Sequence, residues 1–178
     1  MKVLMVHEVT DEILRIPKSK FLDFDLITFD DGLYSQFLNR EFFYALDIPL
    51  VYFISSSIIC PESEEQSKKP IGCHEAHSLF FEHKNLKHYM KMSQIRTLQS
   101  EGCEIGTHNH RHKYYTDFDD FKKNFETSIE YFESYKLKIS KYCSPYNQVY
   151  KLGELYVKSR GFEYFGLGRI AIEALINT

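Results

Sequence analysis

The feature that most constrains the fold is a regular alternation of short apolar runs with segments of helical periodicity. Helical spacing of apolar residues is found over 33–46, 94–101, 118–132 and 149–160. Between and around these segments lie six strand-like runs, at 3–6, 24–29, 50–55, 103–106, 139–143 and 162–168. Such an order is typical of parallel strands joined by crossover helices. It predicts an α/β fold with mostly parallel strands, an α/β barrel or a distorted version of one.

The chain length favours a single domain over residues 1–178. Residues 55–72 are rich in Ser, Glu, Lys and Pro and are expected to form a loop. The pattern over 73–90 is less regular, and we expect a helix or two in an insertion, at about 55–90, that lies over the sheet. Ser93 is the expected N-cap of helix 94–101, and Thr116 or Asp117 that of helix 118–132.

Charge and hydropathy exclude several classes of partner. The chain has 22 basic and 25 acidic residues, a net charge of −3, so no basic excess favours nucleic acid. No apolar stretch approaches the roughly 20 residues of a membrane span. The start, "MKVLMVHEV", lacks the apolar region and cleavage site of a signal peptide, so we expect a cytoplasmic protein. The four cysteines are widely spaced and are expected to be reduced thiols.

Two polar motifs directly follow predicted strands. "LITFDDG" (26–32) ends in the adjacent carboxylates Asp30 and Asp31, and "GTHNHRH" (106–112) places His108 and His112 four residues apart. Two imidazoles and one carboxylate form a ligand set for a divalent ion and leave room for water. The second carboxylate would then lie near positive charge, which favours its ionised form.

Each motif alone has a simpler interpretation. Two aspartates before a glycine usually form a solvated turn or a helix cap, and a histidine-rich hexamer is usually solvated. Both motifs, however, follow strands of an alternating α/β pattern, and active sites of such folds collect at the carboxyl ends of the strands. Together they favour a site.

The two motifs resemble those of a known family. "LITFDDG" and "EIGTHNHRH" are similar to the TFDDG and H-[ST]-x-x-H motifs of the NodB-type polysaccharide deacetylases, carbohydrate esterase family 4. The approach "MSQIRTLQSEGCEIGTH" looks alike too, and "CSPYN" (143–147) is a weaker counterpart of a third motif, R-x-P-[FY]. The resemblance extends over about residues 3–167 and implies a NodB-like distorted (β/α) barrel.

Roles for individual residues follow from the resemblance. It implies that Asp30 is the general base and that Asp31, His108 and His112 bind one divalent ion. Zinc is the expected ion, with cobalt, nickel and manganese as alternatives. Pro145 and Tyr146 would shape the acetyl pocket, with the Tyr146 backbone N–H facing the oxyanion.

The general acid needs a separate candidate, because no histidine follows His112. Most family members carry this histidine near the C-terminus. The branch of poly-N-acetylglucosamine deacetylases carries it in an N-terminal "YH" motif, which "VLMVHEV" resembles. His7 is therefore the expected acid, with a structural histidine at a strand end as the alternative.

The chain departs from the family pattern at three places. Asn109 stands where Ser or Thr is usual, and Asn147 replaces a common glycine. Cys143 or Ser144 occupies the place of an arginine that often braces the base aspartate. The missing arginine matters most, because it would keep Asp30 ionised and oriented.

Other histidines are expected to lie outside the site. His110 should point away from His108 and His112, toward solvent or the rim. A second group is expected to occupy a solvated helix face, with a structural zinc site as the alternative; it consists of Cys73, His74, His77, His83 and His88.

The resemblance implies a metal-dependent N-deacetylase acting on an acetylated oligosaccharide or on a nucleotide-linked or lipid-linked sugar. O-acetyl esters and cyclic amides are substrates of other family members. The alternatives are a non-catalytic carbohydrate-binding protein on the same fold and a different metal hydrolase, such as a phosphoesterase. Against the latter, no phosphate-cradling glycine loop is visible near the motifs.

Overall fold

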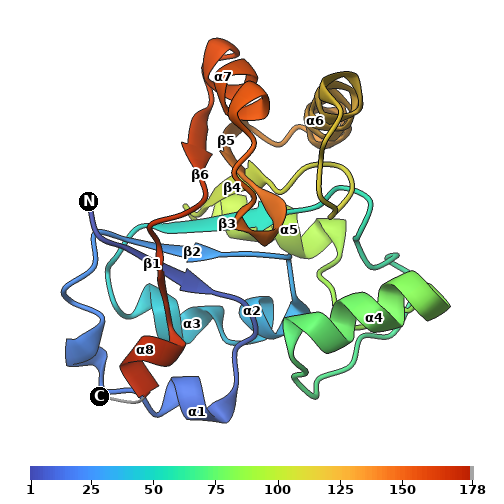
Figure 1. Cartoon of the computed structure of the whole chain (residues 1–178). Coiled ribbons are helices and arrows are strands. Elements are labelled where there is room, and N and C mark those ends of the chain that lie inside the picture. The colour runs from blue at the N-terminus through green and yellow to red at the C-terminus, as the bar shows by residue number, and fades with distance from the viewer. Residues whose placement is uncertain (177–178) are drawn as a thin grey trace.

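A curled sheet of seven parallel strands forms the centre of the protein (Figure 1). The structure is a computed structural model and describes residues 1–176. The strands lie in the order β6-β5-β4-β3-β2-β1-β7. Their bounds are β1 Val3–Val6, β2 Leu26–Phe29, β3 Leu50–Ile54, β4 Glu104–Thr107, β5 Ile139–Cys143, β6 Glu163–Phe165 and β7 Ile170–Ala171. The predicted distorted (β/α) barrel of mostly parallel strands is confirmed.

Helices connect successive strands from β1 to β6, as the alternating pattern predicted, and a short turn leads from β6 to β7. The α-helices are α1 Asp11–Leu14, α2 Tyr34–Leu38, α3 Arg40–Tyr44, α4 Cys73–His83, α5 Met92–Ser100, α6 Phe118–Ser134, α7 Lys151–Ser159 and α8 Glu173–Ile176. Two 3₁₀ turns, Lys18–Lys20 and Pro145–Asn147, complete the set in residues 1–176. In Figure 1, α6 and α7 lie beside the curled end of the sheet, and α1, α2, α3 and α8 lie below β1 and β2. No helix among residues 1–176 is both long and apolar enough to cross a membrane.

Both faces of the sheet are buried, which explains why its strands are almost uniformly apolar. Alternate residues of β3 point to opposite faces: Val51 and Phe53 fill the inside of the curl, and Tyr52 and Ile54 pack in the large outer core. Gly106 of β4 lies against Phe53, and a Cβ atom there would come within 2.5 Å of the Phe53 ring. The sheet can therefore curl tightly because β4 has no side chain at this position.

Several local predictions were wrong in detail. The predicted helix 33–46 is two short helices, since Asn39 leaves helical geometry and its side chain donates to the Ser35 carbonyl oxygen. Helix α5 begins at Met92 with Lys91 as its N-cap, because the Gln94 side chain accepts from the Lys91 N–H. Asp117 caps α6 as expected, and its side chain accepts from Asp120 N–H at 2.7 Å. The short elements α1, α8 and β7 were not predicted.

The segment expected as an insertion contains one helix, α4, after a long irregular loop. Apolar residues of α4, including Ala76, pack with Leu33 and Ile58, which follow β2 and β3. The helix therefore lies beside the carboxyl ends of these strands. We expected this segment to lie over the sheet, but α4 lies at the rim of the sheet.

Candidate active site

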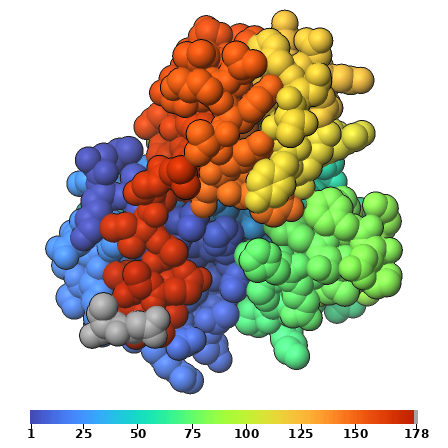
Figure 2. All heavy atoms as spheres, in the orientation of Figure 1, coloured from blue at the N-terminus to red at the C-terminus, as the bar shows by residue number. Residues whose placement is uncertain are grey.

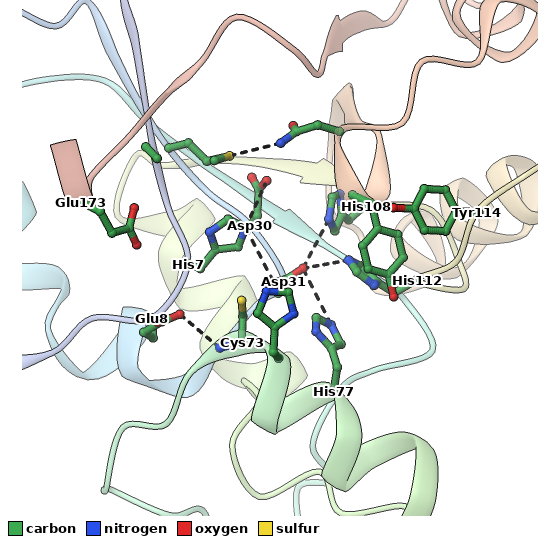
Figure 3. A pocket seen from close by; sticks show the side chains of 15 residues that line it. His7, Glu8, Asp30, Asp31, Cys73, His77, His108, His112, Tyr114 and Glu173 are labelled. Atoms are coloured by element: carbon green, nitrogen blue, oxygen red, sulfur yellow. Dashed lines mark hydrogen bonds and ion pairs between the residues drawn. The ribbon is translucent and has the colours of Figure 1, made fainter.

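A cavity of about 440 Å³ opens at the carboxyl ends of the first strands. Residues far apart in the sequence meet around it, from the ends of β1 and β2, from α4, from the loop after β4, from the turn after β5 and from the β7–α8 segment (Figure 2). The sequence-predicted residues His7, Asp30, Asp31, His108 and His112 all line it (Figure 3). The structure therefore brings together the residues that the two motifs and the N-terminal strand predicted.

The turn after β2 holds the two aspartates in different directions. Asp30 continues the strand, and its N–H donates to the Val6 carbonyl oxygen at 2.9 Å. Asp31 has φ 74° and Gly32 has φ 69°, so the chain turns sharply through two left-handed residues. Aspartate tolerates this conformation and glycine adopts it freely. The buried Gln36 side chain donates to the carbonyl oxygens of both Asp30 and His7, which ties the ends of β1 and β2 together.

The loop after β4 presents the two histidines. His108 N–H donates to the Ile54 carbonyl oxygen, and the His108 Nδ1 lies 2.8 Å from the Cys143 carbonyl oxygen, so Nε2 faces the cavity. Asn109 has φ 67°, a left-handed conformation that asparagine tolerates. Its Oδ1 accepts from His110 N–H. The departure at Asn109 is therefore compatible with a tight loop that returns His112 to the cavity.

Two imidazole nitrogens lie close to one buried carboxylate oxygen. Asp31 Oδ1 lies 3.3 Å from His108 Nε2 and 3.1 Å from His112 Nε2. Despite these short distances, Asp31 Oδ1 lacks a hydrogen bond of proper geometry to any residue in 1–176. Asp31 Oδ1, His108 Nε2 and His112 Nε2 therefore face a common centre and do not form hydrogen bonds with one another. Two imidazoles and a carboxylate in this arrangement fit a divalent ion, whose bonds to such ligands are about 2.0–2.2 Å long.

Charge at the site supports an ionised Asp31. Burial disfavours the charged carboxylate, but the adjacent His108 and His112 rings hold the pKa of Asp31 well below its usual value. Burial also lowers the pKa of His112, so this ring is neutral near pH 7 and its nitrogen is available as a ligand.

A further histidine, His77 of α4, points into the same centre (Figure 3). Its Nε2 lies 3.8 Å from Asp31 Oδ1, and its ring stacks on that of His112 with centroids 4.2 Å apart. Only 8% of His77 is exposed, so the predicted solvated helix face is wrong for this residue. Burial lowers its pKa to about 4, which leaves the ring neutral.

An arginine from another part of the chain takes the place of the one that the third motif lacks. Arg169, in the turn between β6 and β7, donates to both carboxylate oxygens of Asp30 at 2.7 Å each. The same guanidinium donates to Thr28 Oγ1, Asn147 Oδ1 and the Gly166 carbonyl oxygen. Both charged side chains of the pair are 4% exposed. Sequence analysis missed Arg169, because it expected the arginine next to Pro145.

This pair determines the charge of Asp30. Burial alone would favour the neutral carboxyl, but the Arg169 guanidinium lowers the pKa of Asp30 below its usual value. Asn147 adopts a left-handed φ of 51° where glycine is common in the resembled family. Its side chain also orients Arg169. The unusual residues at the third motif and Arg169 thus form one hydrogen-bonded group.

His7 lies beside both aspartates. Its Nε2 is 4.0 Å from Asp30 Oδ2 and 4.0 Å from Asp31 Oδ2, and its side chain is 27% exposed. It stands on the same rim as Asp31 and His108, as the parallel strands predicted. An acid that acts opposite the base would lie across the pocket from Asp30, but His7 lies next to Asp30.

Aromatic rings form the opposite side of the opening. Tyr146 has φ 58° and stacks on the exposed ring of Tyr114, with centroids 4.5 Å apart. Its ring edge also contacts His112. Pro145 is buried beneath the turn. Exposed rings beside a polar cavity are common in small-molecule sites and suit the apolar faces of sugars.

The remaining histidines differ in position. His110 bonds to Ser56 through Nδ1 at 2.9 Å and lines a different hollow, so it points away from His108 and His112 as expected. His83, at the end of α4, has a 66% exposed side chain and fits the predicted solvated face. Cys73 and His74 line the cavity. The signal in the sequence was the four-residue spacing of Cys73 and His77, which gives them one helix face.

Comparison with solved structures identifies the architecture. IcaB from Ammonifex degensii superposes with a TM-score of 0.69 at 16% identity, over 96% of this chain and 84% of that one. The deacetylase PplD of Streptococcus pyogenes, in complex with acetate, superposes with a TM-score of 0.66 at 12% identity, over 100% of this chain and 97% of that one. The chain has a NodB-like distorted (β/α) fold. No protein-family model and no curated sequence matches it significantly.

Proposed function

We propose that the protein is a metal-dependent deacetylase that hydrolyses the acetamide of an N-acetylated sugar in a glycan or glycan precursor. The observation that carries this proposal is that the two adjacent aspartates face different partners. Asp31 faces His108 and His112, whereas Asp30 is turned to Arg169. The NodB-like fold and the deacetylase among its structural neighbours support the same chemistry.

Asp31, His108 and His112 would hold the ion. When bound, a divalent ion supplies a Lewis acid that polarises the acetyl carbonyl and activates water. The hydrogen bond of His108 Nδ1 to the Cys143 carbonyl oxygen fixes its ring so that Nε2 is the ligand atom.

Asp30 is suited to act as general base. Arg169 keeps its carboxylate ionised and fixes its orientation. Oδ2 accepts from both Arg169 and the Cys143 thiol, whereas Oδ1 accepts from Arg169 and keeps a lone pair for a proton. The carboxylate takes a proton from the water that attacks the acetyl carbon. The carbon–nitrogen bond then breaks, and the products are acetate and a free amine.

His7 is suited to donate the proton that the leaving nitrogen needs. Its Nε2 lies 4.0 Å from Asp30 Oδ2 and faces the cavity, so base and acid lie on one side of the substrate. Tyr146 and Pro145 shape the acetyl pocket, where the Tyr146 backbone N–H would donate to the oxyanion. The Tyr114 and Tyr146 rings offer an apolar surface for a sugar ring.

A non-catalytic carbohydrate-binding protein on the same fold was favoured by the missing arginine. Arg169 removes that argument, because it pairs with Asp30 in the geometry that a bracing arginine requires. Catalysis is therefore the function that the geometry supports best.

The test is acetate release. The purified protein would be stripped of metal, reloaded with zinc, cobalt, nickel or manganese, and offered N-acetylated chitooligosaccharides and sugar nucleotides, with O-acetylated sugars in parallel. We expect acetate from an N-acetylated substrate in the reloaded protein, none after stripping, and release slower by about 10²- to 10⁴-fold in Asp30→Asn. Asp23→Asn, at an exposed aspartate that does not line the cavity, is the matched control. Binding of these sugars without acetate release would favour the non-catalytic alternative.

A further inference from the structure

Helix α4 brings to the candidate metal centre a residue that no recognised motif contains. His77 projects from this helix toward Asp31, and α4 is anchored at the rim by its packing on Leu33 and Ile58 (Figure 3). The His77 side chain is nine-tenths buried. Its Nε2 atom is also buried and has no hydrogen-bond partner among residues 1–176.

A buried imidazole nitrogen without a hydrogen-bond partner destabilises the fold unless a ligand binds to it. The backbone of Cys73, one turn earlier in α4, also interacts with the His77 ring. The Cys143 carbonyl oxygen fixes the His108 ring through Nδ1. In both histidines Nε2 is the nitrogen that lies near Asp31.

The distances fit a single ion. Four ligands at about 2.0–2.2 Å in a tetrahedron lie about 3.3–3.6 Å apart. From Asp31 Oδ1, the nitrogens of His112, His108 and His77 lie at 3.1, 3.3 and 3.8 Å. The ligand atoms of Asp31, His77 and His112 lie within 4.8 Å of one another, a group that does not include His108. Binding of one ion by all four residues would therefore draw His108 Nε2 closer to the other two nitrogens.

We propose that His77 is a fourth protein ligand, so that the divalent ion is bound by Asp31, His77, His108 and His112. This inference rests on the proposed function only in that both need an ion at Asp31. Three imidazoles and a carboxylate would occupy every position of a tetrahedral zinc site. Activity then requires an ion with a coordination number above four. The α4 segment would thereby contribute directly to metal affinity.

Zinc affinity provides the first test. We expect His77→Ala to weaken Zn²⁺ binding by about 100-fold or more, measured by competition with a chromophoric chelator, because loss of an outer-shell partner alone costs about 10- to 100-fold. His83→Ala, at the exposed end of the same helix, is the matched control and should bind like the wild type. Equal affinity in His77→Ala and His83→Ala would overturn the proposal.

Cobalt spectroscopy tests direct ligation. The Co²⁺ form of His77→Cys should retain the ion and show thiolate-to-metal charge-transfer absorption that the wild type lacks. Absence of this band in a folded His77→Cys protein that holds cobalt would contradict ligation. The same band in the wild type would overturn the proposal in favour of Cys73, which also lies within 4.8 Å of an Asp31 oxygen.

X-ray absorption on the zinc-loaded wild-type protein is independent of any variant's folding. The proposal predicts three imidazoles around zinc. Two imidazoles would overturn it and leave the proposed deacetylase function intact, whereas a protein that binds no zinc, cobalt, nickel or manganese would remove both.

Discussion

Two groups of residues surround the two adjacent aspartates of the candidate site, and they come from different kinds of segment in the chain. The motif group, Asp30, Asp31, His108 and His112, follows directly from β2 and β4, where backbone hydrogen bonds to neighbouring strands fix its position. The added group, His77 and Arg169, comes from α4 and from the turn between β6 and β7. Each added residue contacts a different aspartate of the motif group. The comparison suggests that the motif group carries the chemistry and that the added group sets its charge and affinity.

Removing both motif histidines should have the largest effect. Without two imidazoles, Asp31 is left with too few partners to hold an ion, so we expect His108→Ala/His112→Ala to lose the bound metal. Elemental analysis after gel filtration would measure this. Equal metal content in the variant and the wild type would show that the motif group is not the metal centre.

Asp30→Asn should separate the base from the ligands. We expect normal metal content and a kcat lower by about 10²- to 10⁴-fold, the typical contribution of a general base. Steady-state kinetics and elemental analysis on the same preparation would measure both. An Asp30→Asn protein without metal would mean that the two aspartates have been assigned the wrong way round.

His7→Ala should distinguish substrates by their leaving group. An amine needs a proton to leave, so we expect kcat for an N-acetylated sugar to fall by about 10²-fold or more. An activated acetyl ester should be affected less, and metal affinity should stay unchanged. His110→Ala, whose side chain lines a different hollow, is the control. Full amidase activity in His7→Ala would rule out its role as acid.

Substitution of Arg169 tests the role of the added group, and we expect it to lower the rate less than loss of His7 or Asp30 does. Loss of the guanidinium removes the charge that lowers the pKa of Asp30, so this pKa should rise and the acidic limb of the kcat/KM profile should move to higher pH. We expect about a 10- to 100-fold loss in Arg169→Lys, which cannot pair bidentately. Because Arg169→Lys keeps the positive charge, the pH test needs Arg169→Ala, and an unchanged acidic limb in that variant would argue against this role.

Arg169→Ala should also destabilise the fold by about 3–5 kcal/mol, because it leaves a buried carboxylate unpaired. Chemical denaturation would measure this, and Arg169→Lys should retain part of the stability. A fully stable Arg169→Ala protein would show that Asp30 is accommodated without its partner.

The sequence predicted the strands and the motif group because both are local. Apolar runs identify strands, and a polar motif that follows a strand lies at the sheet's active edge. Arg169 lies 139 residues from Asp30, and nothing in "GLGRI" indicates where the turn after β6 returns. The sequence places His77 one helical turn after Cys73 on one face of α4. It does not show whether this face contacts solvent or the cavity, because that depends on how α4 packs on the rest of the protein. The roles of the site residues, the metal's identity and a cytoplasmic location stay predictions.

The most direct test of the account is a crystal structure of the zinc-loaded protein with the ion located by anomalous scattering. The account predicts a single ion bound by Asp31, His108 and His112, with His77 as the proposed fourth ligand and with Asp30 uncoordinated and still paired with Arg169. An ion on Asp30, or zinc bound away from this cavity, would contradict the central claim that the two adjacent aspartates have separate roles.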